Sequence, residues 1–562
     1  MGEVKKKKAS VDAVPVKSLV IGLFDPGMTP LFRAGLGGLA ASLRARMLEI
    51  DPTARWPRGE DESVEIPVAD GTAVVQSQRI CIHFGPRGPE AFLQDLFEHA
   101  FRLRPPHQVI DLPGTYTSNQ PVRLGIQVAS QDAVTRTFLQ HGSTRKPSGS
   151  KKPVSTDIDD KIEQVIVQPL KSYVHQKHET WRELADAIKG GQSVQLSGWA
   201  YPGAILRHDK FKQTGIYYSG PEALCGCFAL VGCVSLQGSR NSGILVIPEP
   251  NDLLRFAETR PQLSPQKVSD AFVTGVSDAV LLVELVLRML SRQDAFQRHG
   301  VRNVRGVLLR STPWASQQKL RVRIIDPSQL LSHLDDEVLD LYECAVRELP
   351  TTLHIRAAAE EDQASFFPIY SELRAFITDN LAAGRRWFQD FGTAKTDDPK
   401  HPQFLHRYWS KKDNLGALRP EERKGLIKMS TYLSETEKLL VRSVHVALRQ
   451  RYGAIAAECE HNDVLRKNRF DKETERWRLN FAGAKTHAQV RASLTDLWSR
   501  AGRNSELQAH WPALLPLLHP DEWQLVRDLV LLALASYAGS GAKENTSTAS
   551  SGAQEQNESS PY

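Results

Sequence analysis

Short apolar runs alternate with longer amphipathic segments over the first part of the chain. The amphipathic segments carry apolar residues at helical spacing and predict helices at 33–50, 91–101, 174–188 and 266–290. The apolar runs are bounded by turn residues and predict strands at 18–24, 79–84, 122–128, 193–196, 224–236, 244–247, 304–309 and 320–325. This alternation predicts a mixed α/β region over residues 18–355.

The pattern changes after about residue 366, where only helical spacing remains. The strongest helix is expected at 520–537, because Pro520 suits a first helical turn and Asp521 and Glu522 suit the positive end of a helix dipole. Its apolar run at 529–535 predicts deep burial. We therefore expect an α+β protein, in which the mixed α/β region precedes an all-helical bundle over residues 356–540.

The two ends of the chain lack core-forming residues. Residues 1–17 predict a basic, flexible N-terminus, and residues 541–562 predict a disordered tail.

A strand, a turn and a glycine-rich helix start follow one another near the N-terminus. The turn is expected at residues 25–27, and the helix contains Gly35, Gly37 and Gly38. Neither G-x-G-x-x-G nor the Gly-Lys-Ser/Thr end of a P-loop is present, so no nucleotide site is inferred. Close packing of the helix against a sheet is the expected use of these glycines.

The composition excludes several classes of protein. The 562 residues include six cysteines, too few and too scattered for a disulfide framework, so free thiols are expected. Cys225, Cys227 and Cys233 lie in an apolar run without a fourth ligand nearby and are expected to be structural thiols in a buried strand. No run reaches the roughly 18 apolar residues of a membrane span, and no signal peptide is evident. A cytoplasmic protein without membrane contact, metal or cofactor is expected.

Positive charge is concentrated between residues 401 and 500, which hold twenty Lys and Arg against twelve Asp and Glu in a chain of net charge +6. Four residues fall at i, i+4, i+7 and i+11 and predict a basic ridge on one face of a helix: Lys438, Arg442, His445 and Arg449. Leu433, Leu440, Val444 and Ala447 fall on its other side. The ridge is either a contact for a phosphate backbone or an ordinary solvated face.

Three further segments combine cations with polar or aromatic residues. A loop is expected at 141–153, either clamping nucleic acid or uninvolved, with Arg145, Lys146, Lys151 and Lys152. The segment at 196–212 sets Trp199 and Tyr201, suited to base stacking, near Arg207, His208, Lys210 and Lys212. The segment at 313–323 holds side chains that can bond base edges, namely Gln317, Gln318, Lys319, Arg321 and Arg323. Surface packing with ordinary polar neighbours is the alternative for the last two segments.

Groups that could carry catalysis are sparse. His208 and Asp209 form an HD dipeptide, but a metal-dependent phosphohydrolase needs further ligands. Asp157, Asp159 and Asp160 form an acidic cluster that is expected to start a helix and not to cradle a metal. Because no H-E-x-x-H or G-x-S-x-G motif is present, binding is favoured over catalysis. The alternatives are an HD-type phosphohydrolase or nuclease and a general RNA-binding scaffold.

Several of these segments carry a family resemblance. Taken in order from about residue 18 to residue 537, the chain resembles the large subunit of a type I CRISPR Cascade, in the MYXAN subtype related to type I-B. The resemblance rests on residues 24–27, 33–39, 201–208, 247–253, 313–319 and 523–537. One departure is that a His often precedes Arg33 of the Arg-Ala-Gly motif in that family, whereas Phe32 stands here.

The resemblance implies a non-catalytic subunit that binds crRNA and double-stranded target DNA, recognises the PAM and promotes R-loop formation. Residues 18–355 would recognise the PAM and the guide-RNA end. The bundle resembles the small subunit of such complexes, which lines the displaced single strand, and would use the basic ridge for this. Other partners implied are the backbone, cap and small Cascade subunits, with a helicase-nuclease or a transposition protein downstream. Related systems make the small subunit by internal translation, so a start at Met429 is a hypothesis.

Overall fold

The structure, a computed structural model, describes residues 17–59, 61–117, 123–140, 142–158, 161–195, 217–239, 242–293, 299–310, 321–325, 336–355, 366–392, 420–459 and 462–537. The chain forms two compact units, an N-terminal unit of residues 1–387 and a C-terminal unit of residues 388–562. The described part of the first unit mixes strands and helices, whereas that of the second contains helices alone. The predicted fold class is therefore confirmed.

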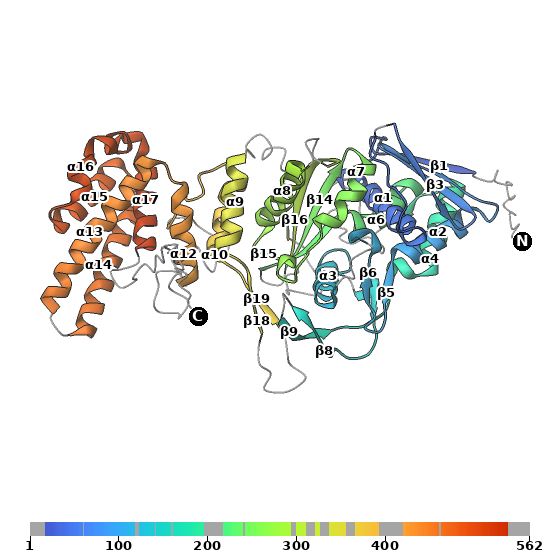
Figure 1. The fold of residues 1–562 in the computed structure, drawn as a ribbon, viewed down its shortest axis with the longest axis horizontal. Helices are drawn as coiled ribbons and strands as arrows, with labels where there is room; N and C mark the ends of the chain where they lie inside the picture. The colour runs from blue at the N-terminus through green and yellow to red at the C-terminus, as the bar shows by residue number, and fades with distance from the viewer. Residues whose placement is uncertain are drawn as a thin grey trace, which may run out of the picture. The chain divides into compact units, whose positions relative to one another are not determined.

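A four-stranded antiparallel sheet opens the N-terminal unit (Figure 1). Its order is β1-β4-β3-β2, with β1 Ser18–Gly22, β2 Ser63–Val68, β3 Gly71–Gln76 and β4 Arg79–His83. Alternate residues such as Ile66, Ala73 and Ile82 are buried, as expected when one face of a sheet covers a core. The strands predicted at 18–24 and 79–84 are thus confirmed, as is the helix at 91–101, which is α2 Gly88–Ala100.

A five-stranded sheet forms the centre of the same unit, in the order β15-β13-β14-β16-β17. The strands are β13 Val234–Gly238, β14 Ser242–Pro250, β15 Phe272–Val273, β16 Val301–Arg310 and β17 Arg321–Ile325. Leu245 and Ile247 of β14 join one core with α1 Pro30–Ile50 and α6 Gly220–Gly232. Ile244 and Val246 join another with α8 Val276–Gln293. Helices on both faces explain why β14 is buried at every position rather than at alternate ones.

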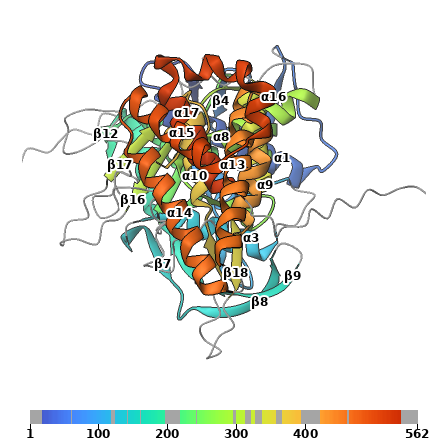
Figure 2. The same cartoon turned by 90° about the vertical axis from the view of Figure 1, so that its left-hand side faces the viewer.

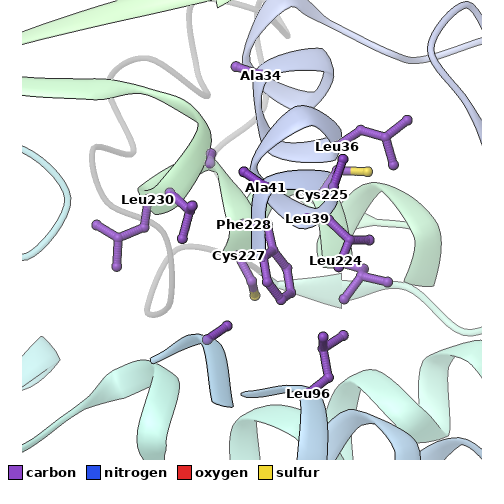
Figure 3. Packing of buried hydrophobic residues seen from close by; sticks show 14 of the residues in the cluster. Ala34, Leu36, Leu39, Ala41, Leu96, Leu224, Cys225, Cys227, Phe228 and Leu230 are labelled. Atoms are coloured by element: carbon purple, nitrogen blue, oxygen red, sulfur yellow. The ribbon is translucent and has the colours of Figure 1, made fainter. Parts of the chain in front are cut away.

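Helices α1 Pro30–Ile50 and α6 Gly220–Gly232 lie side by side at very short range (Figures 1 and 3). A Cβ built at Gly35 would lie 1.8 Å from the carbonyl oxygen of Cys225, and one at Gly232 would lie 1.7 Å from that of Ala34. The glycines therefore permit backbone contact, as expected, but Gly35 and Gly38 approach another helix and not a sheet. Gly37 instead faces Phe256 of α7 Leu253–Thr259.

Two predicted strands are wrong. The run at 224–236 lies mostly in α6, whose start is fixed by reciprocal bonds between Ser219 and Glu222, and only its end enters β13. Helix α6 is buried on every side and accordingly carries apolar residues on every side. Its sequence therefore lacks the 3.6-residue alternation of apolar and polar positions that marks a surface helix. The run at 122–128 belongs to α3 Leu124–Arg136. Cys225, Cys227 and Cys233 are buried free thiols, and burial raises the pKa of Cys227 and Cys233 to about 12.

The described residues of the N-terminal unit also form small paired strands and further helices. The helices are α4 His178–Gly190, α9 Asp336–Glu348 and α10 Glu372–Ala382. The strand pairs are β5 Arg102–Arg104 with β6 Val109–Asp111, β7 Arg145–Pro147 with β10 Leu170–Tyr173, β8 Lys152–Ile158 with β9 Lys161–Val167, β11 Val194–Gln195 with β12 Tyr217–Tyr218, and β18 Thr352–Ile355 with β19 Phe366–Ile369.

Helix α10 belongs to the N-terminal unit, which moves the division of the chain beyond the expected residue 355. Its Arg374 donates two hydrogen bonds to one carboxylate oxygen of Asp278 in α8, at 3.0 and 2.8 Å. Tyr342 of α9 donates to the same oxygen at 2.8 Å, and both the carboxylate and the phenol ring are fully buried. This buried network fixes α8, α9 and α10 together, so α10 is not part of the C-terminal bundle.

In its described part, the C-terminal unit contains the α-helices α12 Pro420–Met429, α13 Glu435–Cys459, α14 Asp463–Gly483, α15 His487–Ala501, α16 Ser505–Leu514 and α17 Trp523–Ser536. Helix α13 packs against α14, α15, α16 and α17 (Figure 2). Residues 529–535 of α17 are at most 5% exposed, which confirms the predicted deep burial. Met429 is fully buried at the end of α12, so a chain starting there would keep α13–α17 and lose α12.

His175 makes the stability of the N-terminal unit depend on pH. Its imidazole is fully buried against the rings of Phe101 and Tyr173, and burial lowers its pKa to about 4 although the backbone of Cys227 opposes the shift. In the unfolded chain His175 therefore binds a proton below about pH 6.5, whereas in the folded unit it stays neutral down to about pH 4. As the pH falls from about 6.5 to about 4, we expect the free energy of unfolding to decrease by about 1.4 kcal/mol per pH unit. His175→Phe should flatten the dependence of melting temperature on pH, and an unchanged slope would contradict the assignment.

Candidate nucleic-acid interface

Three of the four predicted ridge residues lie along the outer face of α13. Arg442 and Arg449 are exposed, and Lys438 is partly exposed, with its Nζ 2.8 Å from Glu435 Oε1. The predicted apolar side of the helix is confirmed, because Leu433, Leu440, Val444 and Ala447 are at most 3% exposed. The guanidinium groups thus project from a helix whose other side is fixed in the core.

His445 does not share that exposed face, which corrects its assignment to the ridge. Its Nε2 lies 2.9 Å from the carbonyl oxygen of Ala533 and 3.2 Å from Ser536 Oγ, both in α17. Burial is the main cause that lowers the pKa of this imidazole, so it is neutral at pH 7 and carries no charge for a phosphate. Regular helical spacing predicted the position of His445 correctly, but the packing of α17 against α13 covers the ring.

An aromatic side chain that the sequence interpretation missed lies beside the ridge. The ring of Tyr537 is 5.7 Å from His445 and 5.5 Å from Tyr452, and it is only partly buried. Burial raises the pKa of the Tyr537 phenol, while the nearby charge of Arg449 opposes the shift. Tyr537 follows the apolar run of α17 after Ser536 alone, so in the sequence it gives no sign of lying near the surface. We call Lys438, Arg442, Arg449 and Tyr537 the α13 stripe.

Many other cations of the C-terminal unit are neutralised locally. In α14, Arg466 pairs with Asp463 at 2.6 Å, Arg469 with Glu458 at 2.8 Å, and Arg476 with Asp496 at 3.0 Å. Exposed pairs of this kind contribute little to stability but they cancel charge. The excess of positive charge between residues 401 and 500 is therefore concentrated on fewer groups, among which are the arginines of the α13 stripe.

The predicted flexible loop at 141–153 is largely paired backbone in its described part, which corrects that expectation. Arg145 and Lys146 lie on β7, which pairs with β10, and Lys152 begins β8. The guanidinium of Arg145 donates to the carbonyl oxygens of Leu139 and Thr135, so it is engaged with the protein itself. Lys146, Lys151 and Lys152 are exposed and keep their predicted availability to a polyanion.

Most residues of the two predicted nucleic-acid segments lie outside the described part of the chain. They are the PAM-reading candidates Arg207, Gln317, Gln318 and Lys319, the backbone-contact candidates Lys210 and Lys212, the stacking candidates Trp199 and Tyr201, and His208 and Asp209 of the HD dipeptide. Arg321 begins β17, where it pairs with Arg310, so the strand expected at 320–325 is confirmed. The first segment is bounded by β11 and β12, which pair directly through Gln195 and Tyr217. The roles of these residues stay predictions.

The motif residues near Phe24, Arg33 and Glu249 come together in the N-terminal unit. The Arg33 guanidinium lies 5.4 Å from the ring of Phe24, and its Nη1 is 3.6 Å from the buried Glu249 carboxylate. Arg305 bonds the other oxygen of Glu249 at 2.6 Å. Phe32 directly precedes Arg33, and its ring is fully buried, 4.9 Å from Tyr218. These contacts join α1, β14 and β16 and explain the motifs structurally.

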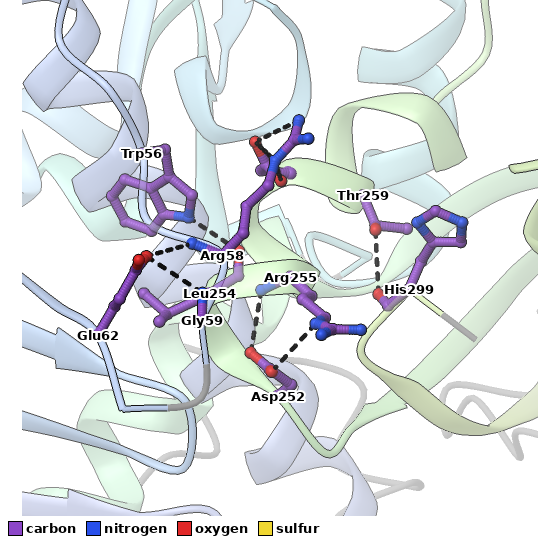
Figure 4. Close-up of polar contacts among 10 residues, drawn as sticks. Trp56, Arg58, Gly59, Glu62, Asp252, Leu254, Arg255, Thr259 and His299 are labelled. Atoms are coloured by element: carbon purple, nitrogen blue, oxygen red, sulfur yellow. Dashed lines mark hydrogen bonds and ion pairs between the residues drawn. The ribbon is translucent and has the colours of Figure 1, made fainter. Parts of the chain in front are cut away.

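The polar end of the motif at 247–253 also serves the fold (Figure 4). Asp252 caps α7 by accepting a bond from the backbone N–H of Arg255 at 3.0 Å. The segment after α1 is fastened to the same helix, because Trp56 Nε1 donates to Leu254 O at 2.8 Å and Arg58 pairs with Glu258 at 3.0 Å. We therefore assign Asp252 to helix capping and not to ligand binding.

Two searches of the described residues bear on other classes of site. No group of three or more His, Cys, Asp or Glu side chains in the described ranges is arranged to hold a metal ion. Among the helices of the described residues, none has the length and apolar content to cross a membrane.

Comparison with known proteins identifies similar sequences at both ends of the chain. Residues 20–227 match the family model described as the DevT N-terminal domain, and residues 428–561 match the DevT C-terminal domain. The chain is 45% identical over 532 residues to a protein of Myxococcus xanthus (strain DK1622) described as CRISPR-associated protein Cas8a1/Csx13. That match covers 93% of this chain and 89% of the relative.

Proposed function

Because the chain belongs to the DevT family of CRISPR-associated proteins and is the large subunit of a Cascade complex, we propose that it acts without catalysis, by binding crRNA and target DNA. It recognises the PAM beside the target and promotes R-loop formation. In an RNA-guided complex, base pairing reads the target while the protein supplies motif recognition and backbone charge. The N-terminal unit would serve PAM and guide-RNA end recognition, and the C-terminal unit would guide the displaced strand.

The observation that carries this proposal is the α13 stripe. Its arginines are exposed on a helix whose opposite side is buried, so they are held out to solvent by a rigid support. Rigid, clustered cations bind a phosphate backbone by releasing its counterions. For the reading of base edges at the PAM we propose Arg207, Gln317, Gln318, Lys319 and Arg321, of which Arg321 is held on β17.

The experiment that tests the function is purification of the tagged chain, expressed with the genes beside its own, followed by sequencing of the RNA that accompanies it. Short RNAs with constant ends and variable middles are the expected result. RNA of mixed sequence would favour a general scaffold. Absence of RNA, with the neighbouring proteins present, would overturn the proposed binding of crRNA.

Arg442→Gln should weaken DNA binding about equally for all sequences. The reason is that a backbone contact carries no base information, and its loss should reduce the slope of log K against log salt by about 0.7 for single strands and about 0.9 for duplex. The measurement is a titration at several salt concentrations.

Arg469→Gln is the matched control for Arg442→Gln, because it removes the same charge from the same unit. Arg469 is already paired with Glu458, so a clearly smaller change in slope is expected. Equal changes in slope for the two variants would show that overall charge, and not the α13 stripe, determines binding.

A further inference from the structure

The ring of Tyr537, at the edge of the α13 stripe, offers a ligand an aromatic contact in addition to the charge of the arginines. Tyr537 is partly exposed, yet its ring lies against two other rings, His445 and Tyr452, on α13. The hydroxyl of Tyr452 is in turn bonded to Thr474 of α14 at 2.5 Å, which fixes that ring. The cluster therefore presents one further aromatic surface at a defined position, next to Arg449.

We propose that Tyr537 is a stacking platform for an unpaired base of a single strand that runs along the α13 stripe. Stacking on aromatic side chains next to a cationic groove is how proteins bind single strands without sequence preference. From Lys438 to Arg449 the helix rises about 16 Å, which equals about five nucleotides at the 3.4 Å spacing of a duplex strand and fewer when the strand is extended. This inference deepens the proposed function and rests on it.

The geometry also gives His445 a role. The imidazole is neutral, and its Nε2 lies within hydrogen-bond distance of Ala533 O and Ser536 Oγ, at the last turn of α17. Tyr537 is the next residue, so this contact fixes the point from which its side chain leaves the helix. His445 is thus a positioning residue that acts through Tyr537, whereas Arg442 and Arg449 supply charge for phosphates.

A partly exposed aromatic ring such as that of Tyr537 favours a single strand over a duplex as the ligand. Bases inside a duplex are stacked on one another and their faces are not open to a side chain, whereas every base of a single strand has a free face. A partner protein is a different proposal, and the clustering of Arg442 and Arg449 beside the ring favours a polyanion over it.

The test compares single-stranded and duplex DNA of one sequence on the full chain. Tyr537→Leu should weaken single-strand binding about 5-fold or more, the effect of losing one stacked base, and should leave duplex binding within about twofold. Tyr537→Phe keeps the ring and should restore single-strand binding. Equal weakening of both ligands, or of neither, would overturn the proposal.

Two further variants separate stacking from general effects. Trp511→Leu removes a ring that is 56% exposed on α16, a helix without Lys or Arg, and should change neither affinity. His445→Ala should reproduce the selective loss of single-strand binding, and His445→Gln, whose amide can still donate to Ala533 O, should restore part of it. Loss of duplex binding in His445→Ala would indicate a merely structural role.

Cross-linking in the assembled complex distinguishes the source of the strand. A photoreactive thymidine in the displaced DNA, or a photoreactive uridine in the guide RNA, should label the peptide that contains Tyr537, and the labelled strand is the occupant. Label on neither strand, or on another protein subunit instead, would overturn the proposal. Selective loss of single-strand binding in Tyr537→Leu, together with absence of guide RNA from the chain purified with its neighbouring proteins, would uphold the platform and overturn the proposed binding of crRNA.

Discussion

Gly35→Ala should lower the free energy of unfolding of the N-terminal unit by about 3 kcal/mol or more. The added Cβ would lie 1.8 Å from the carbonyl oxygen of Cys225, and no side-chain rotation relieves a contact between two helix backbones. Alanine improves helix propensity by about 1 kcal/mol, which offsets only part of the clash. Urea unfolding followed by hydrogen exchange in peptides of α1 and α6 would measure the loss.

Gly190→Ala is the matched control in the same unit. Gly190 is the last residue of α4, and the nearest atom to its added Cβ would be Cγ of Gln192 at 3.4 Å, on a flexible side chain. The variant should be neutral or stabilised by up to about 1 kcal/mol. If both alanines behaved alike, the close approach of α1 and α6 would not be the cause of the sensitivity at Gly35.

Arg374→Met should destabilise the N-terminal unit by about 3–5 kcal/mol, because it leaves the buried Asp278 carboxylate without its counter-charge. Asp278 is fully buried, and the side chain of Arg374 is 5% exposed. Because the pair joins α8 to α10, hydrogen exchange in α10 should accelerate more than in the four-stranded sheet. The measurement is exchange under native conditions together with urea unfolding.

Two comparisons make the Arg374 prediction specific. Asp278→Asn combined with Arg374→Met removes both charges and should recover part of the loss, since the amide oxygen can still accept from Tyr342. Arg58→Met breaks an ion pair whose arginine is 69% exposed and should change stability by less than about 1 kcal/mol. Equal effects of Arg58→Met and Arg374→Met would mean that burial does not matter for this pair.

The division of the chain illustrates what pattern analysis misses. After residue 366 the sequence shows mainly helical spacing, so a boundary near 355 was a reasonable prediction. The structure instead keeps β19 and α10 in the first unit, through the pairing of β18 with β19 and the ion pair of Arg374 with Asp278. Arg374 and Asp278 are nearly a hundred residues apart, so their pairing leaves no local signal, and hydrophobic periodicity reports only local order.

The candidate site shows the same limit on a smaller scale. Periodicity predicted correctly that Arg442 and Arg449 face away from the core, because their position on α13 follows from 3.6 residues per turn. It assigned His445 to the same exposed ridge and gave no hint of Tyr537. Both errors arise from α17, whose last turn covers His445 and brings Tyr537 beside it.

The sequence by itself determined the fold class, the buried α17, the basic outer face of α13 and the family resemblance. These features depend on local periodicity, on composition and on ordered motifs, all of which are present in the chain before it folds. The tertiary structure alone decided that Gly35 meets another helix, that α10 joins the first unit and that an aromatic ring flanks the arginines. Each of those depends on contacts between segments distant in sequence, which only the packing of the elements creates.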